Sequence, residues 1–302
     1  MTRSVQYGLL LLLMSMIQSV AADVKLKPHV LASQSEGNYK AIVDETRGKL
    51  KGAGFEVIGE YSPYKGTTII VVTNEELKKN AAASRHGGFG AVQRVSISQV
   101  KKQVQIAFTN PVYMANVYRM KGDLSAVRQK LEKTLGKVKD FGAEEGLTAE
   151  DLREYHYKIF MEYFDEPYEL ASFTSHDEAV KAVEKGLAAG RGGVSRVYRL
   201  DIPGKDEVVF GVGMTRGCSG DEYIMSRIDF ADIKSATHLP YEIMASGKDV
   251  VALHARFRIA QSFPDLSMMG SNSFMSIMCA PGEIEEALTA VVKGEKKKEE
   301  DF

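Results

Sequence analysis

The chain has 302 residues, 44% of them hydrophobic, and its 39 basic and 40 acidic residues leave a formal net charge of -1. A balance this close to neutral offers no electrostatic attraction for nucleic acid or for an anionic membrane surface. The length suits about two ordinary domains, each large enough to bury its own core.

Residues 1–22 have the pattern of a secretory signal peptide. Arg3 precedes an apolar stretch from Tyr7 to Ile17, and small residues follow. The apolar stretch is shorter than the roughly 20 residues of a membrane-spanning helix, so we expect cleavage after Ala21 or Ala22, with a retained anchor as the alternative. We therefore expect a periplasmic or secreted protein with no stable membrane span after cleavage and no nucleic-acid partner.

Residues 23–137 are predicted to form a first α+β repeat. Apolar residues at helical spacing indicate helices, β-branched runs indicate strands, and Gly, Pro and Asn mark the breaks between them. The pattern predicts a helix from Tyr39 to Gly52, strands at 55–62 and 67–73, a helix at 74–84, strands at 91–98 and 103–109, and a helix at 124–135.

Residues 174–293 repeat this order of elements and are predicted to form a second, diverged repeat. Four residues recur at a constant offset: Val57, Pro63, Lys65 and Val72 reappear as Val197, Pro203, Lys205 and Val212. Repeated element order of this kind favours duplication. The predicted fold class is α+β, with two tandem two-layer domains, each a small, mainly antiparallel sheet with helices on one face.

The linker, residues 138–173, carries an amphipathic aromatic pattern. Thr148-x-x-Asp151 has the spacing of a capping box, and apolar residues at helical spacing predict a helix from Ala149 to Tyr163. Its apolar face needs a partner, so we expect it to clamp the two repeats together, with His156 as a core histidine. The charged tail, residues 294–302, is predicted to be disordered.

Three motifs stand out in the first half: Gly54-Phe55-Glu56-Val57-Ile58, Tyr61-Ser62-Pro63, and Thr109-Asn110-Pro111 followed shortly by methionine. Together they resemble bacterial domain-of-unknown-function family 302, over about residues 38–136 and more weakly over 175–292. The resemblance implies a compact exported α+β domain in which an Asn-Pro strand end leads into a short methionine-bearing helix. It brings no catalytic residue. In the second half, Phe263-Pro264-Asp265 stands where Asn110-Pro111 is expected.

Sulfur-bearing side chains cluster near the C-terminal end. On a helix Met275, Met278 and Cys279 would share a face, and soft sulfur ligands select Cu(I), although methionine also fills irregular core gaps at this spacing. Met114 and Met120 are expected to be packing residues. Cys218 and Cys279 could pair as a disulfide in an oxidising compartment, or could remain two separate buried thiols.

Other polar groups give weaker signals. The segment Arg85-His86-Gly87-Gly88 could approach a flat or anionic ligand closely, and it also suits an ordinary turn before a strand, as does Arg191-Gly192-Gly193. His254, Arg256 and Arg258 alternate on what we expect to be one face of a strand, which would suit a carboxylate or phosphate if it lined a cleft. No two histidines have the spacing of a zinc site.

These observations favour an exported, non-catalytic binding or accessory protein whose partner is an unknown small molecule or periplasmic protein. The ligand is expected in the groove between the two repeats, near Asn110, Tyr113 and the segment from Met268 to Cys279, with His86 and Arg256 as further candidate ligand residues, and no cofactor is identified. Two alternatives remain open. One is a Cu(I)-binding protein that uses Met275, Met278 and Cys279, and the other is a thiol-dependent enzyme that uses Cys218.

Overall fold

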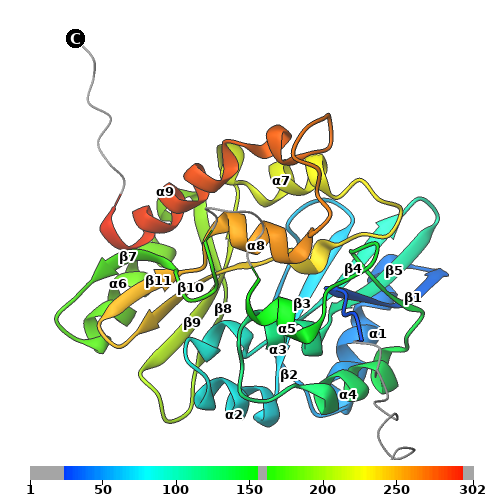
Figure 1. Ribbon diagram of the computed structural model, residues 1–302, viewed down its shortest axis with the longest axis horizontal. Helices are drawn as coiled ribbons and strands as arrows, with labels where there is room; N and C mark the ends of the chain where they lie inside the picture. The colour runs from blue at the N-terminus through cyan, green and yellow to red at the C-terminus, as the bar shows by residue number, and fades with distance from the viewer. Residues whose placement is uncertain (1–23, 156–161, 295–302) are drawn as a thin grey trace, which may run out of the picture.

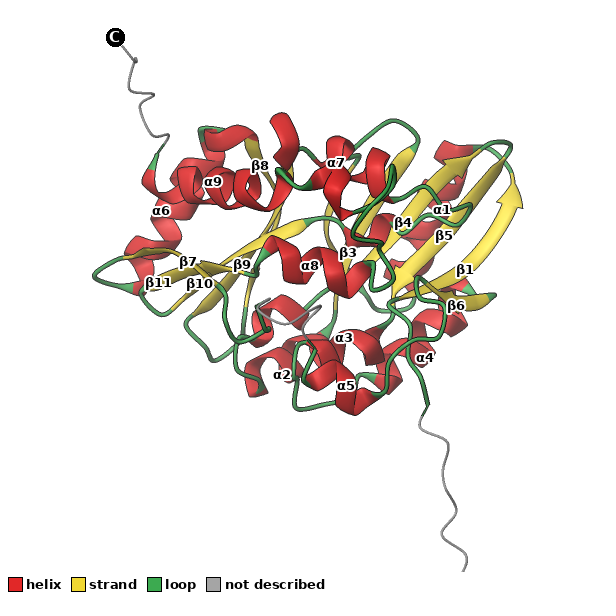
Figure 2. Cartoon of the chain, turned by 45° about the horizontal axis from the view of Figure 1, so that its top comes forward, coloured by secondary structure: helices red, strands yellow, loops and turns green. Residues whose placement is uncertain are grey.

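A computed structural model describes residues 24–155 and 162–294, which form two antiparallel sheets with helices (Figures 1 and 2). The signal-peptide prediction, His156 and residues 295–302 of the predicted tail lie outside the described residues. No helix within the described ranges is long and apolar enough to cross a membrane.

The first half is a six-stranded sheet in the order β2-β3-β4-β5-β1-β6, in which each neighbouring pair is antiparallel. Helices α1 and α4 pack on one face of this sheet. The strands are β1 (His29–Glu36), β2 (Glu56–Tyr61), β3 (Thr67–Thr73), β4 (Gln93–Val100), β5 (Gln103–Thr109) and β6 (Lys139–Phe141), and the helices are α1 (Tyr39–Gly52), α2 (Glu75–Ala83), η1 (Gly87–Gly90), α3 (Pro111–Val117) and α4 (Ser125–Leu135).

The second half is a five-stranded antiparallel sheet in the order β7-β11-β10-β9-β8, and α6 and α9 cover one of its faces. Its strands are β7 (Tyr168–Ser172), β8 (Val194–Asp201), β9 (Glu207–Met214), β10 (Tyr241–Ser246) and β11 (Asp249–Ala252). Its helices are α6 (His176–Ala188), η2 (Arg191–Gly193), η3 (Gly217–Ser219), α7 (Asp221–Ile228), η4 (Ala236–His238), α8 (Ala255–Ser262), η5 (Phe274–Ile277) and α9 (Ala280–Lys293).

Five strands of the first sheet are connected in the same order as the five strands of the second. In each half a first strand and helix precede two hairpins, and the first strand lies beside the fifth. The predicted α+β class, with two antiparallel sheets and helices on one face of each, is confirmed. The sequence pattern misses β1 and β7, the first strand of each half, because neither alternates clearly between polar and apolar residues.

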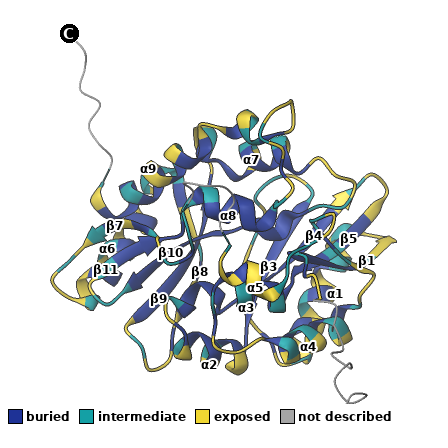
Figure 3. Cartoon of the chain, viewed as in Figure 1, coloured by how far each residue is buried: buried dark blue, intermediate teal, exposed yellow. Residues whose placement is uncertain are grey.

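The helix-free faces of the two sheets are covered by the opposite half. Segment η4 packs on β3, β4 and β5 of the first sheet, and η1 packs on β9 and β10 of the second. Buried side chains from both halves, among them Val209, Met244 and Phe257, join a single apolar core with the first sheet. Figure 3 shows this buried layer running through the centre of the molecule.

The connecting segment packs against both halves but has less helix than predicted. Helix α5 covers only Ala149–Arg153, with Glu154 and Tyr155 outside it, and residues 156–161 lie outside the described part of the chain. The capping box between Thr148 and Asp151 forms as expected. Leu152 is fully buried and the Tyr155 hydroxyl donates to the Ala260 carbonyl oxygen, so these residues hold the halves together.

Candidate functional site

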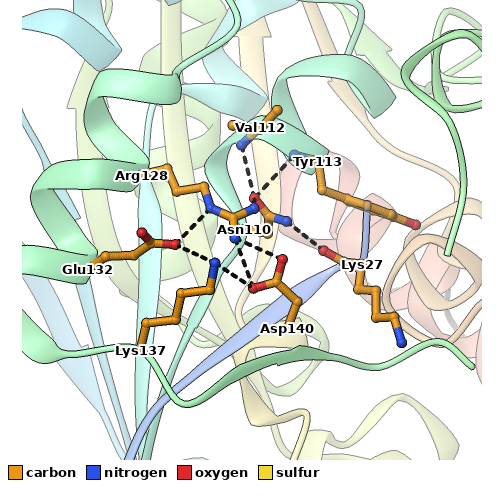
Figure 4. A network of polar contacts seen from close by, with 8 residues as sticks. All are labelled: Lys27, Asn110, Val112, Tyr113, Arg128, Glu132, Lys137 and Asp140. Atoms are coloured by element: carbon orange, nitrogen blue, oxygen red, sulfur yellow. Dashed lines mark hydrogen bonds and ion pairs between the residues drawn. The ribbon is translucent and has the colours of Figure 1, made fainter. Parts of the chain in front are cut away.

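Asn110 is fully buried and its side-chain amide is occupied by structural contacts (Figure 4). The Oδ1 atom accepts hydrogen bonds from the backbone N–H groups of Val112 and Tyr113, which caps α3, and from Arg128 Nη1 at 3.1 Å. The Nδ2 atom donates to the Lys27 carbonyl oxygen at 2.8 Å. Asn110 therefore fixes α3 to the segment before β1 and to α4.

Three ring side chains of the first half and the connecting segment cap the C-terminal carbonyl groups of α8. The hydroxyl of Tyr155 donates to Ala260 O at 3.0 Å, the hydroxyl of Tyr113 donates to Gln261 O at 2.9 Å, and His29 Nε2 lies 3.0 Å from Ser262 O. The last carbonyls of a helix lack intrahelical partners, so these contacts satisfy them. They also place the negative end of the α8 dipole beside Tyr113.

A cleft of about 880 Å³ opens at this junction. Its walls come from the N-terminal strand region, α3, the connecting segment and the turn after α8, so that both halves contribute. The lining residues are Leu26, Tyr113, Ala143, Glu144, Glu145, Gly146, Leu147, Glu150, Asp151, Glu154, Tyr155, Pro264 and Asp265. The volume lies within the range of about 300–1,000 Å³ that is usual for small-molecule sites.

Six lining residues are carboxylates and none is lysine, arginine or histidine. Some of these carboxylates have structural contacts: Asp265 Oδ2 accepts from Glu144 N, and Asp151 Oδ2 accepts from Thr148 Oγ1. Lys25 pairs with Glu145 at the exposed edge. The cleft thus carries a strong excess of negative charge, which favours cations.

Sequence reasoning did not identify this acidic lining. The acidic residues between positions 144 and 154 belong to the segment that the sequence pattern assigns to a linker. Asp265 belongs to the turn after α8, where the sequence analysis expected the counterpart of Asn110-Pro111. The signal available in the sequence is the density of acidic residues between positions 144 and 154.

Of the four predicted ligand residues, only Tyr113 lines the cleft. His86 adopts a left-handed backbone conformation before η1, and its ring lies edge-on to Phe164 with centroids 6.4 Å apart. Burial lowers the pKa of His86. Gly87 and Gly88 lie where the backbone is closely packed, since an added Cβ would meet Ala81 O at Gly87 and Val209 at Gly88.

The prediction that His254, Arg256 and Arg258 share one face of a strand is wrong. Strand β11 ends at Ala252, His254 precedes α8, and both arginines lie within that helix, where residues two apart point in different directions. Arg256 is 40% exposed and pairs with Glu162, whereas Arg258 is 1% exposed. The helix forms because Ala, Arg and Gln favour it and its apolar side is buried.

The structure also shows where the helix after the last hairpin of each half begins. The helix that follows the last hairpin begins after Asn110 in the first half and after His254 in the second. Phe263 instead ends α8 as its C-cap, so Phe263-Pro264 is not the counterpart of Asn110-Pro111. His254 makes no side-chain cap hydrogen bond, and the Asn110 cap therefore occurs only in the first half.

Cys218 and Cys279 form a disulfide that joins η3 to the start of α9. In this oxidised state neither cysteine offers the thiolate that a thiol enzyme or a Met/Cys copper site would need. Met275 and Met278 are 53% and 62% exposed, so they do not fill core gaps. Met114 and Met120 are buried, as predicted.

Among the described residues, no group of three or more His, Cys, Asp or Glu side chains has a geometry that could hold a metal ion. Comparisons with protein-family models, with curated proteins and with solved structures found no match to this chain.

Proposed function

We propose that this chain is an exported, non-catalytic binding protein, built from two repeats of a domain like that of family 302, which holds a small organic cation between its halves. The observation that carries the proposal is the cleft of about 880 Å³, to which both halves contribute. Pockets at the junction of two packed units are common ligand sites.

The chemistry of the lining supports a ligand with several amino groups. Carboxylates at Glu144 and Glu150 can form charge-assisted hydrogen bonds with ammonium groups, and the face of Tyr155 can contact alkyl segments or a cation. The negative end of α8 acts in the same direction. The described lining contains no serine, cysteine, lysine or histidine, which supports binding over nucleophilic catalysis.

Two features support the exported setting. The first 22 residues have the charge and hydropathy pattern of a leader peptide. The Cys218–Cys279 disulfide is of a kind that persists in oxidising compartments. The partner, a periplasmic or extracellular amine, would then meet the protein after export.

The test is calorimetric titration of the purified mature chain with spermidine as the probe. We expect saturable binding that weakens as salt is raised, because exposed charge pairs are screened. The double variant Glu144→Gln/Glu150→Gln removes two cleft charges and should weaken binding about tenfold or more.

The matched control is Glu286→Gln, which removes an exposed carboxylate of α9 that is not part of the cleft walls and should leave binding unchanged. Fully acetylated spermidine has the same backbone without the charges and should not bind. Equal affinities for the wild type and the double variant, or no heat of binding to the wild type, would overturn the proposal.

A further inference from the structure

A buried cluster of charged and polar side chains, none of which lines the cleft, joins the two halves. It consists of Arg94 on β4, Tyr118 at the end of α3, Glu242 on β10 and Arg258 on α8, and each is at most 3% exposed. Arg94 and Arg258 both pair with Glu242. Arg258 Nη2 also donates to the carbonyl oxygens of His238 and Pro240.

The charges of the three paired residues do not balance. Two guanidinium groups share one carboxylate, and arginine keeps its proton under ordinary conditions. An uncompensated charge in the protein interior is costly unless another group neutralises it. The cluster therefore needs one more negative charge.

The hydrogen bonds around Tyr118 point to where that charge lies. Arg258 Nη1 donates to Tyr118 Oη at 3.0 Å and Gln261 Nε2 donates to the same oxygen at 2.8 Å. Two donors therefore converge on one phenolic oxygen, and no acceptor for its own proton is found among the described residues. Multiple donors directed at one oxygen favour its ionised form.

We propose that Tyr118 is a tyrosinate at neutral pH and that it supplies the missing negative charge in the joint between the halves. Its proton is released to solvent on folding. Burial alone would raise the pKa of Tyr118, but the attraction of the Arg258 and Arg94 guanidinium groups outweighs it and lowers that pKa, in agreement with the geometry.

The pKa values of the neighbouring tyrosines are shifted in the opposite direction. Tyr113 donates to a backbone carbonyl, and burial raises its pKa well above the ordinary value. Burial likewise raises the pKa of Tyr198, which lies on β8, to about 12. These tyrosines remain protonated, so a phenolate in this region is assigned to Tyr118 alone.

Near-ultraviolet absorbance tests the proposal on the full mature protein, because the chain has no tryptophan to obscure the phenolate band. The native protein at neutral pH should show the absorbance of one tyrosinate, and unfolding at the same pH should abolish it, since a free tyrosine has a pKa of about 10. Tyr118→Phe should lack the band, whereas the matched control Tyr113→Phe should keep it.

Labelling of the tyrosine ring carbon that bears oxygen gives a measurement that needs no variant. One resonance of the folded wild type should have the phenolate shift at neutral pH. If Gln261 instead turns its amide oxygen toward Tyr118, the phenol donates to it and stays neutral. The absence of both the absorbance band and the shifted resonance in folded protein would establish that arrangement and overturn the proposal.

Discussion

The hydroxyl of Tyr61, on the first sheet, lies 3.3 Å from Oδ2 of Asp221, the first residue of α7 in the second half. Asp221 is 1% exposed, and its Oδ2 atom also accepts from Met214 N. Burial raises the pKa of Asp221 to about 7, although these two hydrogen bonds oppose the shift. Burial therefore favours the protonated form of a carboxyl group in the second half that lies against a tyrosine of the first.

The contribution of Asp221 to stability should consequently fall as pH rises. A carboxyl whose pKa is raised from 3.8 in the unfolded chain to about 7 in the folded protein contributes stability that is complete below the unfolded value and is lost as pH rises through the folded value. Denaturant unfolding at a series of pH values should show the wild type losing stability relative to the variant Asp221→Asn between about pH 4 and about pH 7.

Asp221→Asn mimics the protonated acid at every pH, so the difference in stability between the wild type and this variant isolates the contribution of Asp221. The wild-type curve also contains other groups, because burial raises the pKa of Asp229 to about 6 and lowers the pKa of His29 to about 4, and the histidine changes stability in the opposite direction. A variant that loses stability with rising pH as steeply as the wild type would show that Asp221 is not the group responsible.

Gly88 should be intolerant of a larger side chain. A Cβ at this position would lie 2.6 Å from Val209 Cγ2 and 2.8 Å from Met244 Sδ, both on the second sheet. Gly88→Ala should cost about 1–3 kcal/mol through overpacking at the contact between η1 and β9. Thermal or denaturant unfolding measures the loss.

Gly48→Ala is the matched control. Gly48 lies within α1, and an added Cβ would meet nothing within 4 Å beyond the helix itself, so alanine should raise stability by about 0.5–1 kcal/mol. A cost at Gly48 equal to that at Gly88 would contradict the packing explanation.

Local sequence pattern predicts most of the first half because its signals are local. The β-branched run Thr67–Thr73 forms β3, Asn74 caps α2, and the helical spacing of Val127 and Leu131 marks the buried side of α4. The strand at 103–109 is placed correctly because Asn110-Pro111 stops it.

The remaining features depend on contacts between distant segments, which periodicity cannot reveal. Arg258 lies at two-residue spacing from Arg256, which favours a strand in the sequence, but burial between the halves selects a helix there. The acidic cleft is invisible in the sequence because its walls at Tyr113, Glu150 and Asp265 come together only after folding. Tyr113 is nevertheless predicted, since it follows the Asn-Pro motif.

The disulfide should stabilise the fold measurably. It links residues 61 positions apart, and the chain-entropy model gives roughly 4 kcal/mol for a loop of that length. Chemical reduction of the wild type should lower its free energy of unfolding. The double variant Cys218→Ala/Cys279→Ala should show a loss of similar size without reductant. Reductant should leave the double variant unaffected, and a change there would mean that the reagent acts elsewhere.

Asn110 and Asn38 provide a matched pair for the structural role of the Asn-Pro motif. Both cap a helix, but the Asn38 side chain makes an exposed cap to Ala41 N, whereas Asn110 is buried and also bonds Lys27 O and Arg128. Asn38→Ala should cost about 1 kcal/mol, the usual value for a lost cap.

Asn110→Ala should cost about 1–3 kcal/mol more than Asn38→Ala, because it leaves a backbone carbonyl and a guanidinium N–H without their partner. Denaturant unfolding of both variants under one set of conditions measures the difference. Equal costs would mean that the contacts to Lys27 and Arg128 add nothing to the cap. A larger cost at Asn110 would mean that its side chain stabilises the packing of α3 against α4 and against the segment before β1, in addition to capping α3.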